Sequence, residues 1–218
     1  LAAVLSGAMT GCGATTTETI TAPQIEQYRI LRIAVLPFMV SPSTPGQERG
    51  YAAPAPPAVA GEKLADLFYL KLNAREGLAV VPPRMVHEAM PSITASVASR
   101  NVLQNLGERL DVAALLEGTV RVYRERKGSA IGLEKPGDAA AVGFSARLVS
   151  VKDGKILWSG DYYERQRPLT EDVSGFFERG ARYLTVEQLA DSAVNHVLRE
   201  FPLGRQIQRM QGEMSPSP

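Results

Sequence analysis

Apolar residues follow two different periods along the chain, and the first half shows the helical one. Residues 32–38 are an apolar run interrupted near its end by proline, which is typical of a buried strand. Apolar residues then recur at helical spacing over 60–72, and a second short apolar run follows at 78–81. A strand, a helix and a strand of these lengths predict a parallel pair with a right-handed crossover.

The second half changes to a period of two, which is typical of half-buried strands. Apolar and polar residues alternate over 116–122, 142–148 and 156–162. Between the last two segments, Asp153-Gly154 is a tight-turn signal. We therefore expect a three-stranded antiparallel meander with one packed face and one polar face.

Helical spacing also occurs on both sides of this meander, over 84–90, 97–110 and 172–184. The clearest helix follows a capping-box sequence from Thr185 to Gln188 and stops before a proline. The predicted fold class is α/β, with a mixed β-sheet of about five strands (a parallel pair plus the meander) flanked by helices.

The charge balance and the scarcity of metal ligands remove several classes of function. Lys and Arg number 24 and Asp and Glu number 23, so a net charge of +1 gives no electrostatic case for nucleic acid. A structural zinc site takes about four ligands, whereas the chain has one cysteine and two histidines, His87 and His196, which we interpret as structural. No phosphate-binding loop, GxGxxG, HExxH or GxSxG motif is present. We expect no metal, no cofactor and no catalytic residue, and thus not an enzyme.

The single cysteine follows an uncharged run of small and apolar residues, which is typical of the end of a secretory signal peptide. This run is too short to span a membrane, which takes about 20 residues. Met9-Thr10-Gly11-Cys12 resembles the lipobox of bacterial lipoproteins, and the resemblance implies cleavage before Cys12 and acylation of that residue. Gly13, in place of aspartate, then favours the outer membrane, on its periplasmic face.

One ordered domain is expected between two less ordered ends, because 44% hydrophobic and 22% charged residues are close to globular averages. The expected parts are a signal-peptide remnant at 1–11, a lipidated cysteine and Thr-rich tether at 12–27, a periplasmic α/β domain at 28–203 and a disordered tail at 204–218. Within the domain, a Pro-rich loop at 39–57 and a charged loop at 124–141 are expected, and their roles are open.

Three strings in the domain are similar to those of a known family, namely Arg32–Phe38, Leu110–Tyr123 and Phe144–Ser159. Residues 28–203 resemble the bacterial envelope lipoproteins CsgG, LpoB and PelC and the amino-terminal domain of TolB. The resemblance implies a fold similar to an anticodon-binding domain and no enzymatic activity. Only the lipidated Cys12 carries over as a site.

The resemblance also implies a non-catalytic lipoprotein that scaffolds or regulates an envelope assembly, for example in polymer or curli-like secretion. A ring and a monomeric adaptor both remain open, as does an LpoB-like activator of a peptidoglycan synthase. The expected partners are the membrane, through the lipid anchor, envelope proteins (secretion machinery or a peptidoglycan synthase) and further copies of the chain. The identity of the partner and of the polymer is not given by the sequence.

Aromatic side chains are the candidate partner-binding residues, since exposed aromatics at strand ends often anchor partners. Tyr123 and Tyr163 fall on the polar parity of their strands and are expected to be exposed. Trp158 and Tyr162 share the parity of Ile156 and are expected in the core.

The rival hypothesis from another class is an envelope glycan hydrolase. Such enzymes use two carboxylates about 5–9.5 Å apart. The candidates are Asp161 and Glu164, with Glu171 and Asp172 nearby. We interpret Asp161 and Glu164 instead as solvent positions of a strand, and Asp172 as a helix cap.

Overall fold

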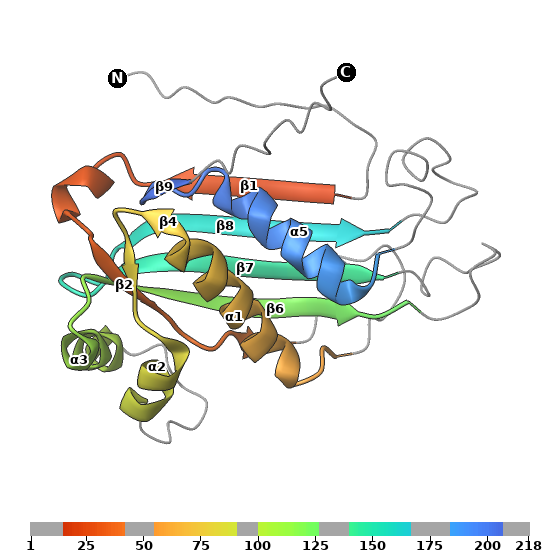
Figure 1. Cartoon of the computed structure of the whole chain (residues 1–218), viewed down its shortest axis with the longest axis horizontal. Coiled ribbons are helices and arrows are strands. Elements are labelled where there is room, and N and C mark those ends of the chain that lie inside the picture. Colours follow the sequence, from red (N-terminus) through yellow and green to blue (C-terminus); the bar gives the residue numbers. More distant parts are fainter. Residues whose placement is uncertain (1–14, 42–54, 91–99, 127–139, 167–183, 207–218) are drawn as a thin grey trace, which may run out of the picture.

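The computed structural model describes residues 15–41, 55–90, 100–126, 140–166 and 184–206. These residues form a seven-stranded mixed sheet with helices on both faces, together with a small two-stranded ribbon (Figure 1). The predicted α/β class, with parallel and antiparallel strands flanked by helices, is confirmed.

Four long strands form the antiparallel part of the sheet, in the order β1, β8, β7 and β6. Their bounds are Thr15–Thr21 for β1, Ala114–Arg124 for β6, Ala141–Ser150 for β7 and Ile156–Arg165 for β8. Strands β6, β7 and β8 are the predicted meander. The turn between β7 and β8 contains Gly154 at φ 69°, a left-handed conformation that favours glycine.

Three short strands continue the sheet beyond β6 with parallel pairing. They are β2 (Arg32–Val35), β3 (Met39–Val40) and β5 (Ala79–Val80). Strand β2 lies between β6 and β5, and β3 pairs with β6 further along. The parallel pair predicted from 32–38 and 78–81 is therefore confirmed as β2 and β5.

Two longer helices, α1 (Val59–Asn73) and α5 (Val186–Leu198), cross one face of the sheet side by side (Figure 1). The predicted apolar stripe of α1 is confirmed, because none of its inward residues is exposed: Ala60, Leu64, Phe68 and Leu72. The Phe68 ring lies 5.2 Å from the Phe38 ring and 5.7 Å from the Phe144 ring of β7. Full burial of a side chain of this size contributes about 1.5–3 kcal/mol, so this stripe fixes α1 on the sheet.

Helix α5 begins at the predicted capping box. The Thr185 hydroxyl accepts a hydrogen bond from the Gln188 amide at 3.2 Å, and the Gln188 side chain accepts one from the Thr185 amide at 3.1 Å. At the other end, the buried guanidinium of Arg75 donates to the carbonyl oxygens of Leu198 at 2.9 Å and Phe201 at 3.1 Å. Both ends of the helix thus have partners for backbone groups that the helix itself leaves free.

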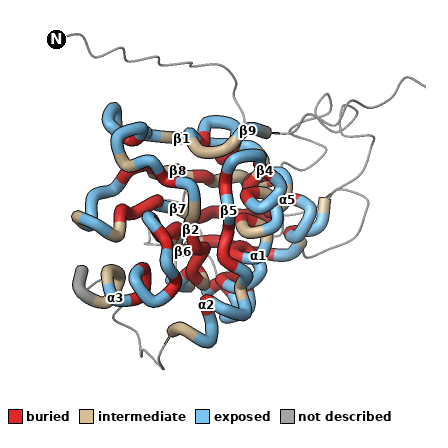
Figure 2. Tube along the Cα trace, turned by 60° about the vertical axis from the view of Figure 1, so that its left-hand side comes forward, coloured by how far each residue is buried: buried red, intermediate tan, exposed pale blue. Residues whose placement is uncertain are grey.

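The other face carries a smaller core under helices α2 (Pro83–Ala89) and α3 (Arg100–Leu110). Its buried apolar residues come from α2, α3, the ends of β2 and β5, and β6: Ala34, Leu36, Val81, Val86, Leu106, Leu110, Val112 and Leu115. Figure 2 shows the buried residues gathered along the strands and the helix sides that face them. Among the described residues, this second core does not extend over β7 and β8 beyond Val151 in the turn that follows β7.

The structure differs from the prediction at both ends of the domain. Residues 15–21 were expected in a tether but form the edge strand β1, and residues 25–28 form a 3₁₀ helix, η1, with Ile25 buried. Threonine is β-branched and favours strands, and β1 occupies the edge that β8 would otherwise leave unpaired. Arg205–Gln206, expected in the tail, form β9 and pair with β4 (Arg75–Glu76).

Several predictions fall on residues that are not described. The signal-peptide remnant, residues 172–183 of the predicted helix 172–184 and most of the two long loops lie outside the described residues, and residue 184 precedes α5 without helical structure. In the Pro-rich segment, Met39–Val40 belong to β3 instead of a loop.

Candidate functional site

The face of the meander opposite α1 and α5 is polar, and we call it the open face. Its side chains alternate with the buried ones, and Arg147 is exposed while the others are partly exposed: Glu117, Thr119, Arg121, Ser145, Ser159, Asp161 and Tyr163. The register places Thr119, Ser145, Asp161 and Glu18 in one row across four strands. The predicted polar face of the meander is thus confirmed.

Ion pairs between the strands of the meander organise the charges of the open face, and one of them reaches across β7 from β6 to β8. Both terminal nitrogens of Arg121 donate to the Asp161 carboxylate at 2.7 Å, and one of them also reaches the Phe144 carbonyl oxygen at 3.3 Å. Arg147 donates to Glu117 at 2.7 Å. Because these four charges cancel in pairs, the open face suits recognition by hydrogen bonds and shape more than by net charge.

A cavity of about 290 Å³ borders the open face where it meets the segment after α2. Glu117, Thr119 and Arg147 form its polar side, and Met39 and Met90 form part of its apolar side. Methionine is flexible and adapts to irregular partners. An apolar group of a partner therefore has room to enter this cavity at the border of the open face.

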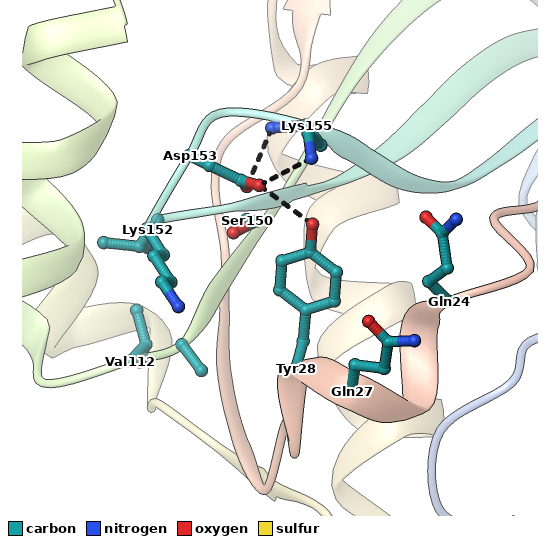
Figure 3. A pocket seen from close by; sticks show the side chains of 10 residues that line it. Gln24, Gln27, Tyr28, Val112, Ser150, Lys152, Asp153 and Lys155 are labelled. Carbon is teal, nitrogen blue, oxygen red and sulfur yellow. Dashed lines mark hydrogen bonds and ion pairs between the residues drawn. The ribbon is translucent and has the colours of Figure 1, made fainter.

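A second, larger cavity of about 510 Å³ lies at the end of the sheet where β7 turns into β8 (Figure 3). Its polar centre is Asp153, whose carboxylate accepts a hydrogen bond from the Tyr28 hydroxyl at 2.9 Å. The Lys155 backbone amide donates to the same carboxylate at 3.3 Å, and the Lys155 ammonium lies 3.3 Å from it. Gln24 and Gln27 of the η1 segment complete the polar side.

The network around Asp153 determines its protonation. Loss of solvent by itself raises the pKa of this carboxyl, but the nearby Ser150 hydroxyl and the hydrogen bonds from Tyr28 and Lys155 outweigh that effect and hold the pKa well below its usual range. The hydrogen bond to Asp153 is also the main reason why the pKa values of Tyr28 and Lys155 are raised. A carboxylate held in its ionised form in this way is suited to binding polar groups and poorly suited to proton transfer near neutral pH.

The structure overturns the expected exposure of Tyr123. This tyrosine is only 9% exposed and belongs to the main core. A β-bulge at Arg121 is the cause, because Val120 pairs with Phe144 while Val122 pairs with Gly143, so the alternation changes phase at this point. Burial is also the main cause of the raised pKa of Tyr123. Its side chain is thus packed inside and does not present a surface to a partner.

Tyr163 lies on the polar face of β8, as the alternation of apolar and polar residues along this strand predicted. It is partly exposed on the open face, and its ring lies over Gly143, where a Cβ atom would come within 3.1 Å of Tyr163 Cδ2. A role in partner binding stays a prediction for this residue.

The expected core positions of Trp158 and Tyr162 are confirmed, with 0% and 2% exposure. The Tyr162 ring stacks 5.8 Å from Phe144, and the Trp158 ring meets Phe201 edge-on at 4.9 Å. Ile156, expected on the same side, is 49% exposed instead, because a second bulge between it and Trp158 changes the phase.

The two carboxylates of the hydrolase hypothesis do not form a pair. Asp161 lies on the open face in the Arg121 ion pair, whereas Glu164 has the parity of Tyr162 and accepts its hydroxyl hydrogen bond at 2.5 Å. Residues three apart on a strand point to opposite faces, so these groups cannot flank one glycosidic bond. The other two candidates, Glu171 and Asp172, lie outside the described residues.

Both histidines have structural surroundings. In α2, the Nδ1 atom of His87 lies 2.8 Å from the Pro83 carbonyl oxygen. The ring of His196 packs 5.8 Å from the Tyr162 ring. Within the described ranges, no group of three or more His, Cys, Asp or Glu residues is arranged to hold a metal ion.

The proposed lipidation site, Cys12, lies outside the described residues. None of the helices in the described part of the chain is both long and apolar enough to cross a membrane. The cavity beside Tyr28 was not expected from the sequence. Residues 28 and 153 are far apart in the chain, and the Asp-Gly turn signal was the single local hint.

Comparison with solved structures finds several that match this chain at low sequence identity. A dodecameric PelC variant from Paraburkholderia phytofirmans is 17% identical, with a TM-score of 0.52 over 88% of this chain and 99% of that chain. Lipoprotein GNA1162 from Neisseria meningitidis is 22% identical over 78% of this chain and 99% of that chain, with a TM-score of 0.39. The carboxy-terminal domain of LpoB from Salmonella enterica is 15% identical over 66% and 94%, with a TM-score of 0.35.

The similarity to PelC at this identity shows a shared fold. The fold that the sequence strings predicted by their resemblance to the CsgG, LpoB and PelC lipoproteins is thereby confirmed. No protein-family model matches the chain, and no curated protein matches it either.

Proposed function

We propose that this protein is a lipid-anchored, non-catalytic envelope lipoprotein that scaffolds or regulates an envelope assembly. The observation that carries the proposal is the fold shared with PelC over 88% of this chain. The lipobox-like Met9–Cys12 sequence supports the anchor, and Gly13 supports a place on the periplasmic face of the outer membrane. The separation of Asp161 from Glu164 supports a role without glycan hydrolysis.

The assembly is proposed to be a ring of many copies, since the PelC structure with this fold is a dodecamer, and to serve polymer secretion, as the resemblance of the sequence strings implies. In this proposal the open face, with Tyr163 and the cavity beside Met39 and Met90, offers a surface for contact with another protein. A methionine-lined cavity beside polar strands is suited to a partner that inserts an apolar side chain and adds hydrogen bonds at the rim.

Metabolic labelling with a palmitate analogue tests the anchor in cells that express the full chain. We expect labelling of the wild-type protein and none of the Cys12→Ala variant. Equal labelling of both would contradict lipidation at this residue.

Mass photometry of the detergent-solubilised protein tests the assembly. A discrete ring of many subunits is expected for the secretion scaffold. A strict monomer that co-purifies with a peptidoglycan synthase would instead support the activator hypothesis, and the scaffold proposal would be abandoned.

A further inference from the structure

Strand β1 leaves very little chain between the proposed anchor and the folded domain. Only Gly13 and Ala14 separate Cys12 from Thr15, where β1 begins. An extended chain advances at most about 3.3–3.6 Å per residue, so three steps reach about 10 Å. An acylated Cys12 therefore holds Thr15 within about 10 Å of the membrane surface.

The start of β1 lies at the same end of the sheet as the ends of β6 and β8 (Figure 1). Thr15 pairs with Glu164, Arg165 pairs with Ala141, and Ala141 pairs with Arg124. We call this the anchor end. The cavity beside Tyr28 lies at the opposite end, where β8 begins. A strand of the length of β8 spans about 30 Å at 3.3 Å per residue, so the two ends are well separated.

The charged side chains at the anchor end differ from those of residues 15–28, which form the edge strand β1 and the segment up to Tyr28. The exposed or partly exposed charges described at the anchor end balance, because Lys63, Arg126 and Arg165 are matched in number by Glu125, Glu164 and Glu187, while Arg124 is buried. The edge segment of residues 15–28 carries Glu18 and Glu26 and neither lysine nor arginine. A surface of anionic phospholipids therefore repels the acidic edge segment more than the anchor end.

We propose that the domain stands end-on upon an anionic phospholipid surface, with the anchor end at the headgroups and the cavity beside Tyr28 facing away. This inference rests on the acylation of Cys12 in the proposed function. The short link brings the anchor end to the membrane, and the charge difference keeps the acidic edge strand from lying flat upon it. The Tyr28 cavity is then open to partners that approach from the periplasm.

Depth-dependent quenching of a fluorophore tests the orientation on the acylated full chain. Acylation consumes the Cys12 thiol, so Thr16→Cys near the anchor end and Glu26→Cys near the opposite end each supply one label site. Both positions are exposed, and circular dichroism checks that each variant is folded. The vesicles contain phosphatidylethanolamine and phosphatidylglycerol, with some lipids that carry a nitroxide on the headgroup. We expect quenching at position 16 to be several-fold stronger than at position 26, and equal quenching would overturn the end-on orientation.

A linker insertion provides the matched control. About 20 Gly and Ser residues between Ala14 and Thr15 add a root-mean-square reach of about 25 Å. Quenching at position 16 is then expected to fall to the level at position 26. If it stays undiminished, the short link is not what holds the anchor end at the membrane, and the inference fails.

Vesicle flotation separates this inference from the proposed function. A chain that is not acylated and does not float with the vesicles contradicts the proposed function itself. A chain that is acylated and floats, but shows equal quenching at both positions, contradicts the orientation alone.

Discussion

Strands β6, β7 and β8 present one side to helices α1 and α5 and the other side to the open face. On the helix side, Phe144, Trp158 and Leu148 are fully buried. On the open face, polar side chains from the same strands remain exposed or partly exposed, and ion pairs connect the strands, for example Arg121–Asp161 from β6 to β8 across β7. Successive residues of a strand point to opposite faces, so one segment of sequence both builds the core and supplies a surface.

This comparison separates the positions that fix the fold from those that are free to bind. Apolar burial on the helix side contributes most of the stability, because it is proportional to the area removed from water. Exposed ion pairs contribute little, since water and salt screen them. The open face can therefore change to suit a partner at small cost to the fold, and graded substitutions on the two sides test this difference.

The largest effect is expected for Phe68→Ala on the helix side. Phe68 is fully buried against the Phe38 and Phe144 rings, so its truncation leaves a cavity. We expect the free energy of unfolding to fall by about 3–5 kcal/mol, measured by urea denaturation. Leu70→Ala is the matched control in the same helix, because Leu70 is 61% exposed, and its effect is expected to stay within about 0.5 kcal/mol. Similar losses for both variants would contradict the packing of α1.

The two tyrosines first proposed as partner contacts give the next largest difference. Tyr123→Ala removes a side chain packed in the main core and is expected to cost about 2–5 kcal/mol. Tyr163→Ala on the open face is expected to cost clearly less. Thermal unfolding of the two purified variants checks the order, and a larger loss for Tyr163→Ala would show that the bulge at Arg121 is misplaced.

A smaller effect on the helix side is expected from overpacking at Gly118. A Cβ atom at this position would lie 2.3 Å from an atom of the Phe38 ring. Gly118→Ala therefore forces the ring to move, and we expect a loss of about 1–3 kcal/mol in urea denaturation. Ser145→Ala on the open face serves as the control and is expected to change stability by less than about 0.5 kcal/mol.

The coupling energy of the Arg121–Asp161 pair tests how much the open face contributes to the free energy of unfolding. A double-mutant cycle with Arg121→Gln and Asp161→Asn is expected to give a coupling energy of about 0.2–1 kcal/mol that falls as salt is added. The Arg147–Glu117 pair has one hydrogen bond instead of two and a more exposed arginine, so its coupling energy is expected at the lower end of that range. A coupling of several kcal/mol would mean that the open face is a structural element instead of an adaptable surface.

The smallest effect is expected at the cavity beside Tyr28 and depends on pH. The pKa of Asp153 is lower in the folded state than in the unfolded state, so its contribution is present above about pH 4 and is lost as the pH falls further. Asp153→Asn should flatten the acid limb of a plot of the urea midpoint against pH. Tyr28→Phe removes one of the hydrogen bonds and should give a partial effect. An unchanged acid limb in both variants would rule out this network as a source of acid sensitivity.

Patterns with long, regular periods were sufficient to predict most of the fold. The stripe of α1, the capping box of α5 and the parallel pair β2–β5 all depend on local spacing, and each is confirmed. Prediction failed where a single inserted residue changed the phase of a strand. The bulge at Arg121 buries Tyr123, and the bulge after Ile156 exposes that residue, because two residues on one strand then face one on its partner.

The candidate site was less predictable than the fold. The alternation of polar and apolar residues in β6, β7 and β8 was sufficient to predict the open face from the sequence, including the position of Tyr163. The cavity beside Tyr28 joins η1 to the turn after β7, and contacts between segments so far apart leave no periodic signal. In the same way, the threonines of residues 15–21 favour a strand, but only the unpaired edge of β8 decides that they form one.

The sequence by itself determined the α/β class, the inward stripe of each long helix, the two-sided meander and the lipobox-like sequence at Cys12, because each depends on neighbouring residues. Tertiary structure decided which face the side chains take after each bulge. It also decided that residues 15–21 form a strand and that a cavity forms around Asp153. These depend on pairing between distant segments, where a partner strand satisfies backbone groups or shifts the register. Within the described residues, that pairing places residues 15–21, which were expected in a tether, in the edge strand β1.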